Sequence, residues 1–254
     1  MSGVGLYSIG VRGLDVPDLL EWARKSSVPF LHLRGGHRGF DLVNRDATTL
    51  RAWRRRVRET VPITGVTADL DLTDLLTTDH AHRRQAAEEL RRLSEAAAEL
   101  GAGWIRLLAR TPLARATPLA LPQTAVPLLV EPHHPDWLTS THLATLYELT
   151  SGQVRLLADT AQLGATVQRA GESGQPALTW LLSRTEALHL SDDGTGLAAH
   201  PDASEVAARA ACRIAAGQRI EVAVEWTGPD RSPATCLAKY RAAASWWNRL
   251  DRSP

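Results

Sequence analysis

The chain has 254 residues, of which 44% are hydrophobic and 22% are charged, a balance typical of a globular protein with a full apolar core. Its 29 Lys and Arg residues and 28 Asp and Glu residues give a formal net charge of +1, which argues against a nucleic-acid footprint or an acidic disordered tail. No apolar run approaches the roughly 18 residues of a membrane span, and the first ten residues do not resemble a secretory signal peptide. We therefore expect a cytoplasmic protein with no nucleic-acid and no membrane partner.

Short apolar runs alternate with longer helical patterns along the chain, which is typical of βα units and a parallel sheet. Eight strands are predicted, at Leu6–Val11, Phe30–Arg34, Ile63–Ala68, Trp104–Ala109, Pro127–Glu131, Val154–Asp159, Ala187–Ser191 and Ile220–Trp226. Helices are predicted at Val16–Ser26, Thr48–Arg58, His80–Leu100, His142–Thr150, Leu178–Arg184, Ala203–Ala216 and Thr235–Leu250. Eight such units in this length predict an α/β fold, a single (β/α)8 TIM barrel domain over residues 1–254.

The connection between the fourth and fifth strands departs from this pattern. Residues Thr111–Val126 contain Pro112, Pro118 and Pro122, and proline both lacks the backbone donor and clashes inside a helix. We expect a shortened, proline-rich fourth helical connection.

Four consecutive strands carry a metal-binding residue type at or near the carboxyl end. These residues are Glu131, Asp159, His189 and Glu225. Each alone reads equally well as an ordinary polar strand-end residue, but active sites of TIM barrels gather at this end of the strands. Three carboxylates and one imidazole at one barrel mouth are costly to bury without a counter-charge. The set therefore predicts one divalent cation, and the residue types suit manganese, magnesium, cobalt or zinc.

The sequence around these residues resembles the xylose isomerase-like TIM barrels, a group that includes sugar phosphate isomerases and epimerases, dehydratases and the AP endonuclease family 2 enzymes such as endonuclease IV. The resemblance is carried by residues 129–133 (LVEPH), 157–160 (LADT), 188–192 (LHLSD) and 224–226 (VEW). It implies that Glu131, Asp159, His189 and Glu225 hold the metal, with Glu131 and Glu225 also exchanging protons with the substrate. It further implies a small polyol or keto-acid substrate, and a homodimer is one expected assembly.

Two departures narrow the resemblance. Epimerases of this group often have a histidine three residues after the aspartate, where this chain has Gln162. Endonuclease IV requires further histidines and a second aspartate for three zinc ions. Gln162 and the lack of a matching Asp-x-His pair before Glu225 argue against that activity.

His133 has the same strand parity as Glu131, and the pair resembles the E-x-H arrangement of dehydratase-like members, in which the histidine is a catalytic base; the alternative is a loop histidine without chemistry. His32 and Arg34 share a parity on the second strand and are predicted to contact substrate, the alternative being an internal salt bridge. Further predicted substrate contacts are Gln162, Asp192 and Trp226, although Trp226 also fits ordinary packing.

Two more features have a structural interpretation. Arg155 and Glu221 lie about four residues before Asp159 and Glu225 and are predicted to pair within the barrel. The turn Gly194-Thr-Gly196 fits either a phosphate cradle or a plain loop, and the plain loop is favoured.

The sequence thus predicts a divalent-metal-dependent isomerase or epimerase that acts on a sugar, keto-sugar or cyclitol through an enediolate. The alternative is a metal-dependent dehydratase of a keto-cyclitol or dehydroshikimate-like acid, and a non-catalytic barrel is the third reading. The only lysines, Lys25 and Lys239, fall in predicted helices, which argues against imine catalysis because that chemistry needs a lysine near the barrel centre.

Overall fold

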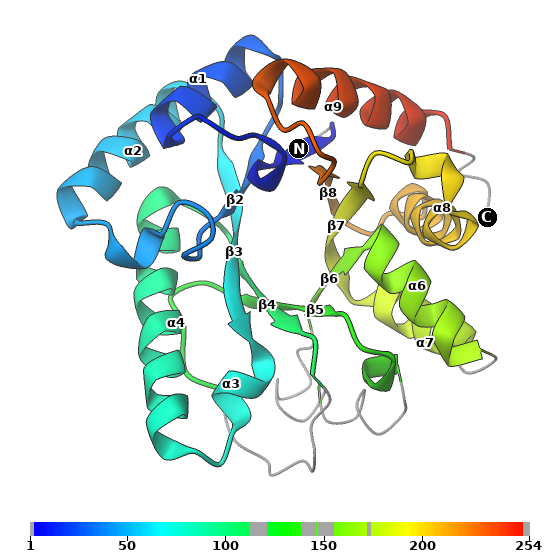
Figure 1. Ribbon diagram of the computed structural model, residues 1–254, viewed down its shortest axis with the longest axis horizontal. Coiled ribbons are helices and arrows are strands. Elements are labelled where there is room, and N and C mark those ends of the chain that lie inside the picture. Colours follow the sequence, from blue (N-terminus) through cyan, green and yellow to red (C-terminus); the bar gives the residue numbers. More distant parts are fainter. Residues whose placement is uncertain (1–2, 112–120, 139–145, 147–154, 172–173, 251–254) are drawn as a thin grey trace.

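The computed structural model describes residues 3–111, 121–138, 146, 155–171 and 174–250. Eight parallel strands form a closed barrel in which each strand pairs with its neighbours in chain order, β1 through β8, and β8 pairs back with β1. Figure 1 looks down this barrel, with the helices outside the ring of strands. The predicted α/β barrel class is confirmed.

All eight predicted strands are present, with small shifts at their ends. Their bounds are β1 Gly5–Tyr7, β2 Leu31–Arg34, β3 Ile63–Asp71, β4 Ile105–Ala109, β5 Leu128–Pro132, β6 Leu156–Asp159, β7 Thr185–Asp192 and β8 Glu221–Trp226. The largest differences are in β1, which gives way to a short 3-10 turn at Ser8–Gly10, and in β3, which continues three residues beyond its predicted end.

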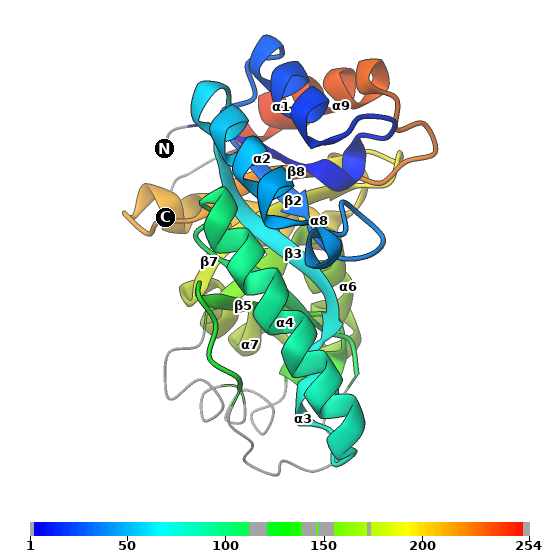
Figure 2. The same cartoon turned by 90° about the vertical axis from the view of Figure 1, so that its left-hand side faces the viewer.

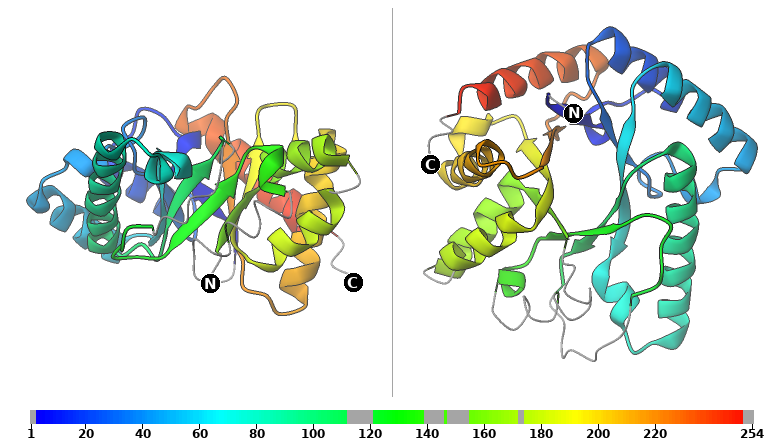
Figure 3. Two further views of the ribbon diagram at one scale, coloured as in Figure 1. Left: turned by 90° about the horizontal axis from the view of Figure 1, so that it is seen from below. Right: turned by 180° about the vertical axis from the view of Figure 1, so that it is seen from behind.

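Helices cover the outside of the barrel (Figures 2 and 3). Several of them begin at a side-chain N-cap. Their bounds are α1 Val16–Lys25, α2 Ala47–Glu59, α3 Leu72–Leu76, α4 His80–Leu100, α6 Thr160–Ala170, α7 Gly174–Ser183, α8 Pro201–Ala215 and α9 Pro233–Asn248. The side chain of Asp79 accepts from the first amides of α4, and Gly101 ends that helix at φ 86°, a left-handed conformation that favours glycine.

Helix α6 was not predicted from the sequence. Gly164 lies in its middle, and glycine lowers helix propensity. A Cβ at this position would lie 2.8 Å from the backbone nitrogen of Ala203, at the start of α8. The glycine therefore lets α6 and α8 approach closely, and tertiary packing outweighs the local preference.

Two other predictions fall wholly or mostly outside the described residues. Of the helix expected at His142–Thr150, only Leu146 is described, and it is helical. Of the proline-rich connection Thr111–Val126, residues 112–120 are outside the described part, and residues 121–126 contain no helix.

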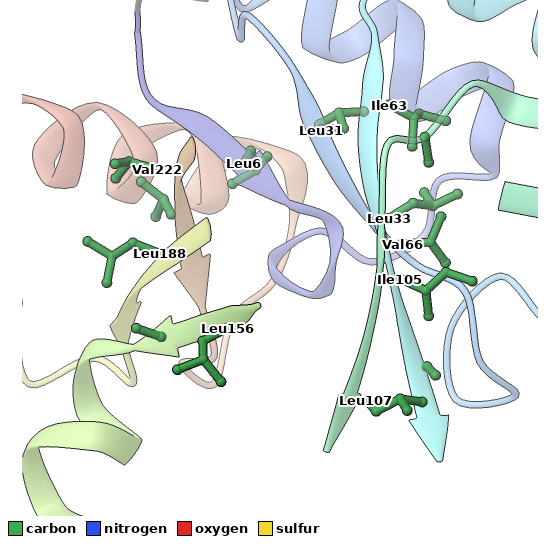
Figure 4. Close-up of a cluster of buried hydrophobic side chains, with 14 of the residues drawn as sticks. Leu6, Leu31, Leu33, Ile63, Val66, Ile105, Leu107, Leu156, Leu188 and Val222 are labelled. Carbon is green, nitrogen blue, oxygen red and sulfur yellow. The ribbon is translucent and has the colours of Figure 1, made fainter. Parts of the chain in front are cut away.

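Apolar side chains on opposite faces of the strands form two packed layers. Outward-facing residues pack between barrel and helices, among them Leu33, Val66, Leu188 and Val222 (Figure 4). Inside the barrel lies a smaller buried group: Leu129, Leu157 and Ala187, on the strands that carry Glu131, Asp159 and His189, and Trp104 immediately before β4. Because side chains two residues apart on a strand face the same side, this inner layer forms the floor beneath Glu131, Asp159 and His189.

No helix among the described residues is long and apolar enough to cross a membrane.

Candidate metal centre

Three of the predicted metal ligands converge at the carboxyl end of the barrel. Asp159 ends β6 and lies opposite His189 on β7, while Glu225 on β8 lies opposite Ser191. One ligand atom each from Asp159, His189 and Glu225 lies within 4.8 Å of the others. His189 and Asp159 are buried, with 0% and 4% of their surface exposed. This is the spacing and burial of a site for one small cation.

Glu131, the fourth predicted ligand, is not part of that 4.8 Å group, and its carboxylate contacts two other side chains. Arg106 on β4 places its Nε 2.8 Å from Glu131 Oε2, and His133 places its Nε2 2.6 Å from Oε1. The Arg106 contact is an ion pair without hydrogen-bond geometry, so among the described residues Glu131 Oε2 is buried without a hydrogen bond. Such an oxygen is available to a further ligand at little cost.

The carboxylates of the cluster have opposite electrostatic environments. Burial, together with repulsion from Glu225 and Glu131, raises the pKa of Asp159 to about 7. Burial and the charge of Glu131 likewise raise the pKa of Glu225 to about 7. Burial also acts on Glu131, but the charge of Arg106 and the contact with His133 outweigh it and hold the pKa at about 2. A divalent cation would relieve the repulsion at Asp159 and Glu225, so these residues fit such an ion.

A series of side-chain contacts inside the barrel orients the ring of His189. His32 on β2 is fully buried; its Nδ1 lies 3.0 Å from His189 Nε2, and its Nε2 lies 3.4 Å from Glu221 Oε2. Trp104 Nε1 donates to the same Glu221 oxygen at 3.3 Å. Although burial raises the pKa of Glu221, the contacts with His32 and Trp104 lower it below its usual value, so the carboxylate is an acceptor.

This series of contacts determines which nitrogen of His189 is free to bind a metal. An ionised Glu221 requires the proton of His32 on Nε2, so His32 Nδ1 accepts from His189 Nε2. The lone pair of His189 then lies on Nδ1, which is 2.9 Å from Glu225 Oε2. Two acceptors at that distance repel unless a proton or a cation lies between them. A second group that fixes the tautomer of a metal-binding histidine is a recurrent feature of metal sites.

Two further contact residues were not predicted. The ring of Tyr7 stacks on His189 with centroids 4.7 Å apart, and its hydroxyl lies 2.7 Å from Thr67 Oγ1. Ser191 Oγ donates to Asp159 Oδ2. Ser191 could have been found, because it shares the strand parity of His189. Tyr7 could not have been found from the sequence, because no other residue of β1 has a side chain that could bind a metal or a substrate.

The predicted substrate contacts lie in different places. Arg34 is near the barrel mouth, with Nη2 3.5 Å from Asp69 Oδ1. Gln162 is exposed on the first turn of α6, and its backbone amide donates to Asp159 Oδ1 at 2.9 Å. Asp192 Oδ1 accepts from the amides of Gly194 and Gly196, so it holds the turn after β7. Because the amides of Gly194 and Gly196 already donate to Asp192, the plain-loop interpretation of these two glycines is favoured over a phosphate cradle.

Trp226 is buried, with 2% of its surface exposed, and its Nε1 donates to the carbonyl of Asp230 at 2.7 Å. Lys239 lies over its ring at 4.7 Å from the centroid. These contacts match the packing alternative for this residue.

The pairing predicted between Arg155 and Glu221 is wrong. Arg155 Nη1 lies 3.4 Å from Glu186 Oε2 on the adjacent strand, and Glu221 pairs with His32. Strand parity did not give the partner, because the β6–β7 register shifts between Leu156 and Leu157, and sequence spacing does not specify such a shift.

Comparison with solved structures places this architecture among known proteins. The 3-keto-D-glucoside 4-epimerase YcjR from E. coli has a TM-score of 0.64 and 16% identity over 98% of this chain and 99% of that chain. The IolI protein, solved with a bound zinc atom, has a TM-score of 0.67 and 11% identity over 99% of this chain and 100% of that chain. The probable 3-DHS dehydratase AsbF from Bacillus anthracis has a TM-score of 0.64 and 14% identity over 95% of this chain and 98% of that chain.

No protein-family model matches the sequence, and no curated protein matches it either. The structural likeness nevertheless extends over almost the entire length of each chain. The protein therefore has the fold of the xylose isomerase-like TIM barrels, as the resemblance implied.

Proposed function

We propose that the protein is a divalent-metal-dependent isomerase or epimerase of a sugar, keto-sugar or cyclitol. The observation that carries this proposal is the group formed by Asp159, His189 and Glu225 within 4.8 Å at the carboxyl end of the barrel, the end where TIM-barrel enzymes bind substrate. YcjR, a 3-keto-D-glucoside 4-epimerase, and AsbF, a probable 3-DHS dehydratase, support an enzyme that acts on a polyol or a cyclic keto compound.

In this proposal the cation is held by Asp159, His189 and Glu225, with Glu131 as a fourth ligand. A bound divalent ion would act as a Lewis acid on the carbonyl and hydroxyl oxygens of the substrate. Manganese, magnesium, cobalt and zinc all suit these donors, and the zinc in IolI is a precedent for one of them.

The two glutamates have different roles in proton transfer. Glu225 takes the proton from the carbon beside the carbonyl. Burial and the charge of Glu131 raise its pKa to about 7 in the metal-free protein, and a bound cation would lower that pKa. Glu131, with its pKa held at about 2, is a poor base in the metal-free protein. Its contact with His133 suggests that the pair returns the proton through His133, whose own pKa is raised by the hydrogen bond to Glu131 against the effect of burial.

A test of the proposal follows solvent hydrogen into the product. A metal-replete preparation is incubated in D₂O with a panel of keto-sugars, keto-glucosides and keto-cyclitols, and products are analysed by mass spectrometry and NMR. An isomerase or epimerase yields an isomer carrying deuterium at the reacting carbon, and Glu225→Gln should abolish this exchange. Protein that neither binds nor is activated by any divalent metal would contradict the proposal.

The contact between Glu131 Oε1 and His133 Nε2 at 2.6 Å also favours a second candidate, dehydration of a keto-cyclitol or dehydroshikimate-like acid. An imidazolium stabilised by Glu131 is suited to protonate a departing hydroxyl group. The two candidates differ in the mass of the product, because dehydration loses water and isomerisation does not. His133→Ala should abolish dehydration and only weaken epimerisation.

A further inference from the structure

A cavity separate from the candidate metal centre opens at the carboxyl end of the barrel. It has a volume of about 300 Å³ and is lined by the segments that follow β1, β2 and β8. Because β8, β1 and β2 are consecutive in the closed barrel, this cavity lies beside the strand that carries Glu225. It is separate from the inner floor of the barrel and contains none of the predicted metal ligands.

Four arginines line this cavity: Arg12, Arg34, Arg38 and Arg231. One nearby carboxylate, Asp69, is engaged mainly by Arg38, whose Nε and Nη2 lie 3.0 and 2.8 Å from Asp69 Oδ1. Arg34 reaches the same oxygen only at 3.5 Å. Within the described part of the chain, Arg12 and Arg231 form no ion pair with a carboxylate.

The guanidinium group of Arg231 is held in position without a counter-ion. It donates to the carbonyls of Ile9, Thr227 and Gly228 at 3.3, 2.9 and 3.3 Å. Partial burial, together with the charges of Arg12 and Arg34, lowers its pKa. Three cations thus face one another at the cavity, an arrangement that an anion would stabilise.

The cavity adjoins the strand that carries Glu225, because β8 pairs with β1 and β1 pairs with β2. A substrate whose reacting carbons lie near Glu225 can therefore place an anionic group at the arginines. The planar guanidinium group is suited to bind phosphate or carboxylate through paired hydrogen bonds.

We propose that Arg12, Arg34 and Arg231 form a subsite for an anionic group of the substrate, a phosphate monoester or a carboxylate. This inference rests on the proposed function, since it assigns the charged end of a sugar or cyclitol whose reacting carbons lie at the metal centre. Within the sugars, keto-sugars and cyclitols of the proposed function, it favours those that carry a phosphate or a carboxylate.

The first experiment measures anion binding without metal. Inorganic phosphate is titrated by calorimetry into the metal-free full chain, and Arg12→Ala should weaken binding by about tenfold because it removes one charge-assisted contact. Arg12 is exposed and makes no described side-chain contact, so its variant should fold normally. Arg55→Ala is the matched control, because Arg55 is an exposed arginine on α2 away from the cavity, and it should bind phosphate as the wild type does.

The second experiment distinguishes the source of the anion with metal-replete protein. Fructose 6-phosphate, gluconate and fructose are compared, and tighter binding of the first or the second identifies a phosphate or a carboxylate. Equal binding of all three, or wild-type phosphate affinity in both Arg12→Ala and Arg231→Gln, would overturn the inference.

A third variant separates this inference from the proposed function. Asp159→Asn removes a predicted metal ligand and should leave phosphate binding to the metal-free protein unchanged. Loss of phosphate binding in this variant would place the anion at the metal centre and refute the subsite. Failure of the proposed function would instead appear as an absence of metal binding, which the phosphate titration does not require.

Discussion

At the scale of single residues, contacts inside the barrel set the orientation and the protonation state of His189. Its Nε2 faces His32 and its Nδ1 faces Glu225, so each ring nitrogen has a separate role. Burial lowers the pKa of both histidines to about 4. Both rings are therefore neutral near pH 7, as a metal-binding imidazole must be.

Replacing His32 should weaken metal binding, although His32 does not touch the metal site's oxygen ligands. His32→Phe retains an aromatic ring beside Trp104 but removes the contact that fixes the tautomer of His189. Loss of such a supporting group typically costs ~10–100-fold in metal affinity, and calorimetric titration of Mn²⁺ measures it. His32→Gln, which keeps a donor and an acceptor, should lose less. Unchanged Mn²⁺ affinity in the folded Phe variant would show that the tautomer is set elsewhere.

The raised pKa values of Asp159 and Glu225 predict how the stability of the metal-free protein depends on pH. Their pKa values of about 7 in the folded state exceed the value of about 4 for carboxylates in an unfolded chain. The folded state therefore holds more protons between these values, and stability is lost as pH rises from about 4 through about 7. Metal affinity should increase over the same interval, because the ligands must lose protons to bind.

Thermal unfolding of the metal-free protein at several values between pH 5 and pH 8 tests this dependence. Asp159→Asn provides the control, since it removes one of the two titrating groups and should flatten the decrease. A melting temperature that rises steadily over this interval in the wild type would contradict the assigned pKa directions.

At the scale of elements, the junction between β6 and α6 combines two tasks in one side chain. Asp159 ends the strand and is also the N-cap of the helix, where its Oδ1 accepts from the amide of Gln162 at 2.9 Å. The helix N-terminus favours negative charge, which offsets part of the repulsion from Glu225. The position of the predicted ligand is therefore fixed by the helix that it begins.

Two substitutions at Asp159 should separate its two tasks. Asp159→Asn keeps an N-capping oxygen but removes the buried charge, so it should abolish metal binding and stabilise the metal-free protein at pH 8. Asp159→Ala also removes the cap, which costs ~1 kcal/mol relative to Asn. Chemical denaturation of both metal-free variants measures the difference. If Asn and Ala unfold at the same denaturant concentration, the cap does not stabilise α6.

At the scale of the whole molecule, the predicted ligands join strands that are far apart in the chain. Glu131 and Glu225 lie at opposite ends of a run of four consecutive barrel strands, β5 to β8. A metal that binds the folded barrel and not the unfolded chain shifts the folding equilibrium by mass action. In the proposed function, a metal held by these four ligands would connect the last four strands of the barrel.

Saturating metal should therefore raise the melting temperature. At a free Mn²⁺ concentration 100 times its Kd, the stabilisation is about 2.7 kcal/mol, or about 5–10 °C for a chain of this size. A chelator should reverse the shift, and Glu225→Gln should show little of it. A shift of equal size in the wild type and in Glu225→Gln would mean that the metal binds elsewhere.

The sequence alone determined the barrel and the list of candidate ligands. Alternating apolar runs and helical patterns define eight βα units, and strand parity places Glu131, Asp159, His189 and Glu225 on inward faces, because both depend only on local periodicity. Helix α6 escaped prediction because Gly164 is present for a contact with α8, which no local rule anticipates.

Only the tertiary structure decided which side chains meet. It separated Glu131 from the other ligands by pairing it with Arg106 and His133, and it connected His32 to His189 across 157 positions of sequence. The three arginines of the proposed anion subsite come from the end of β2 and from two loops, after β1 and after β8, and no periodic pattern relates these positions. Periodicity specifies which face of an element a residue occupies, whereas pairing across the barrel depends on closure of the sheet, which brings distant strands within hydrogen-bonding range.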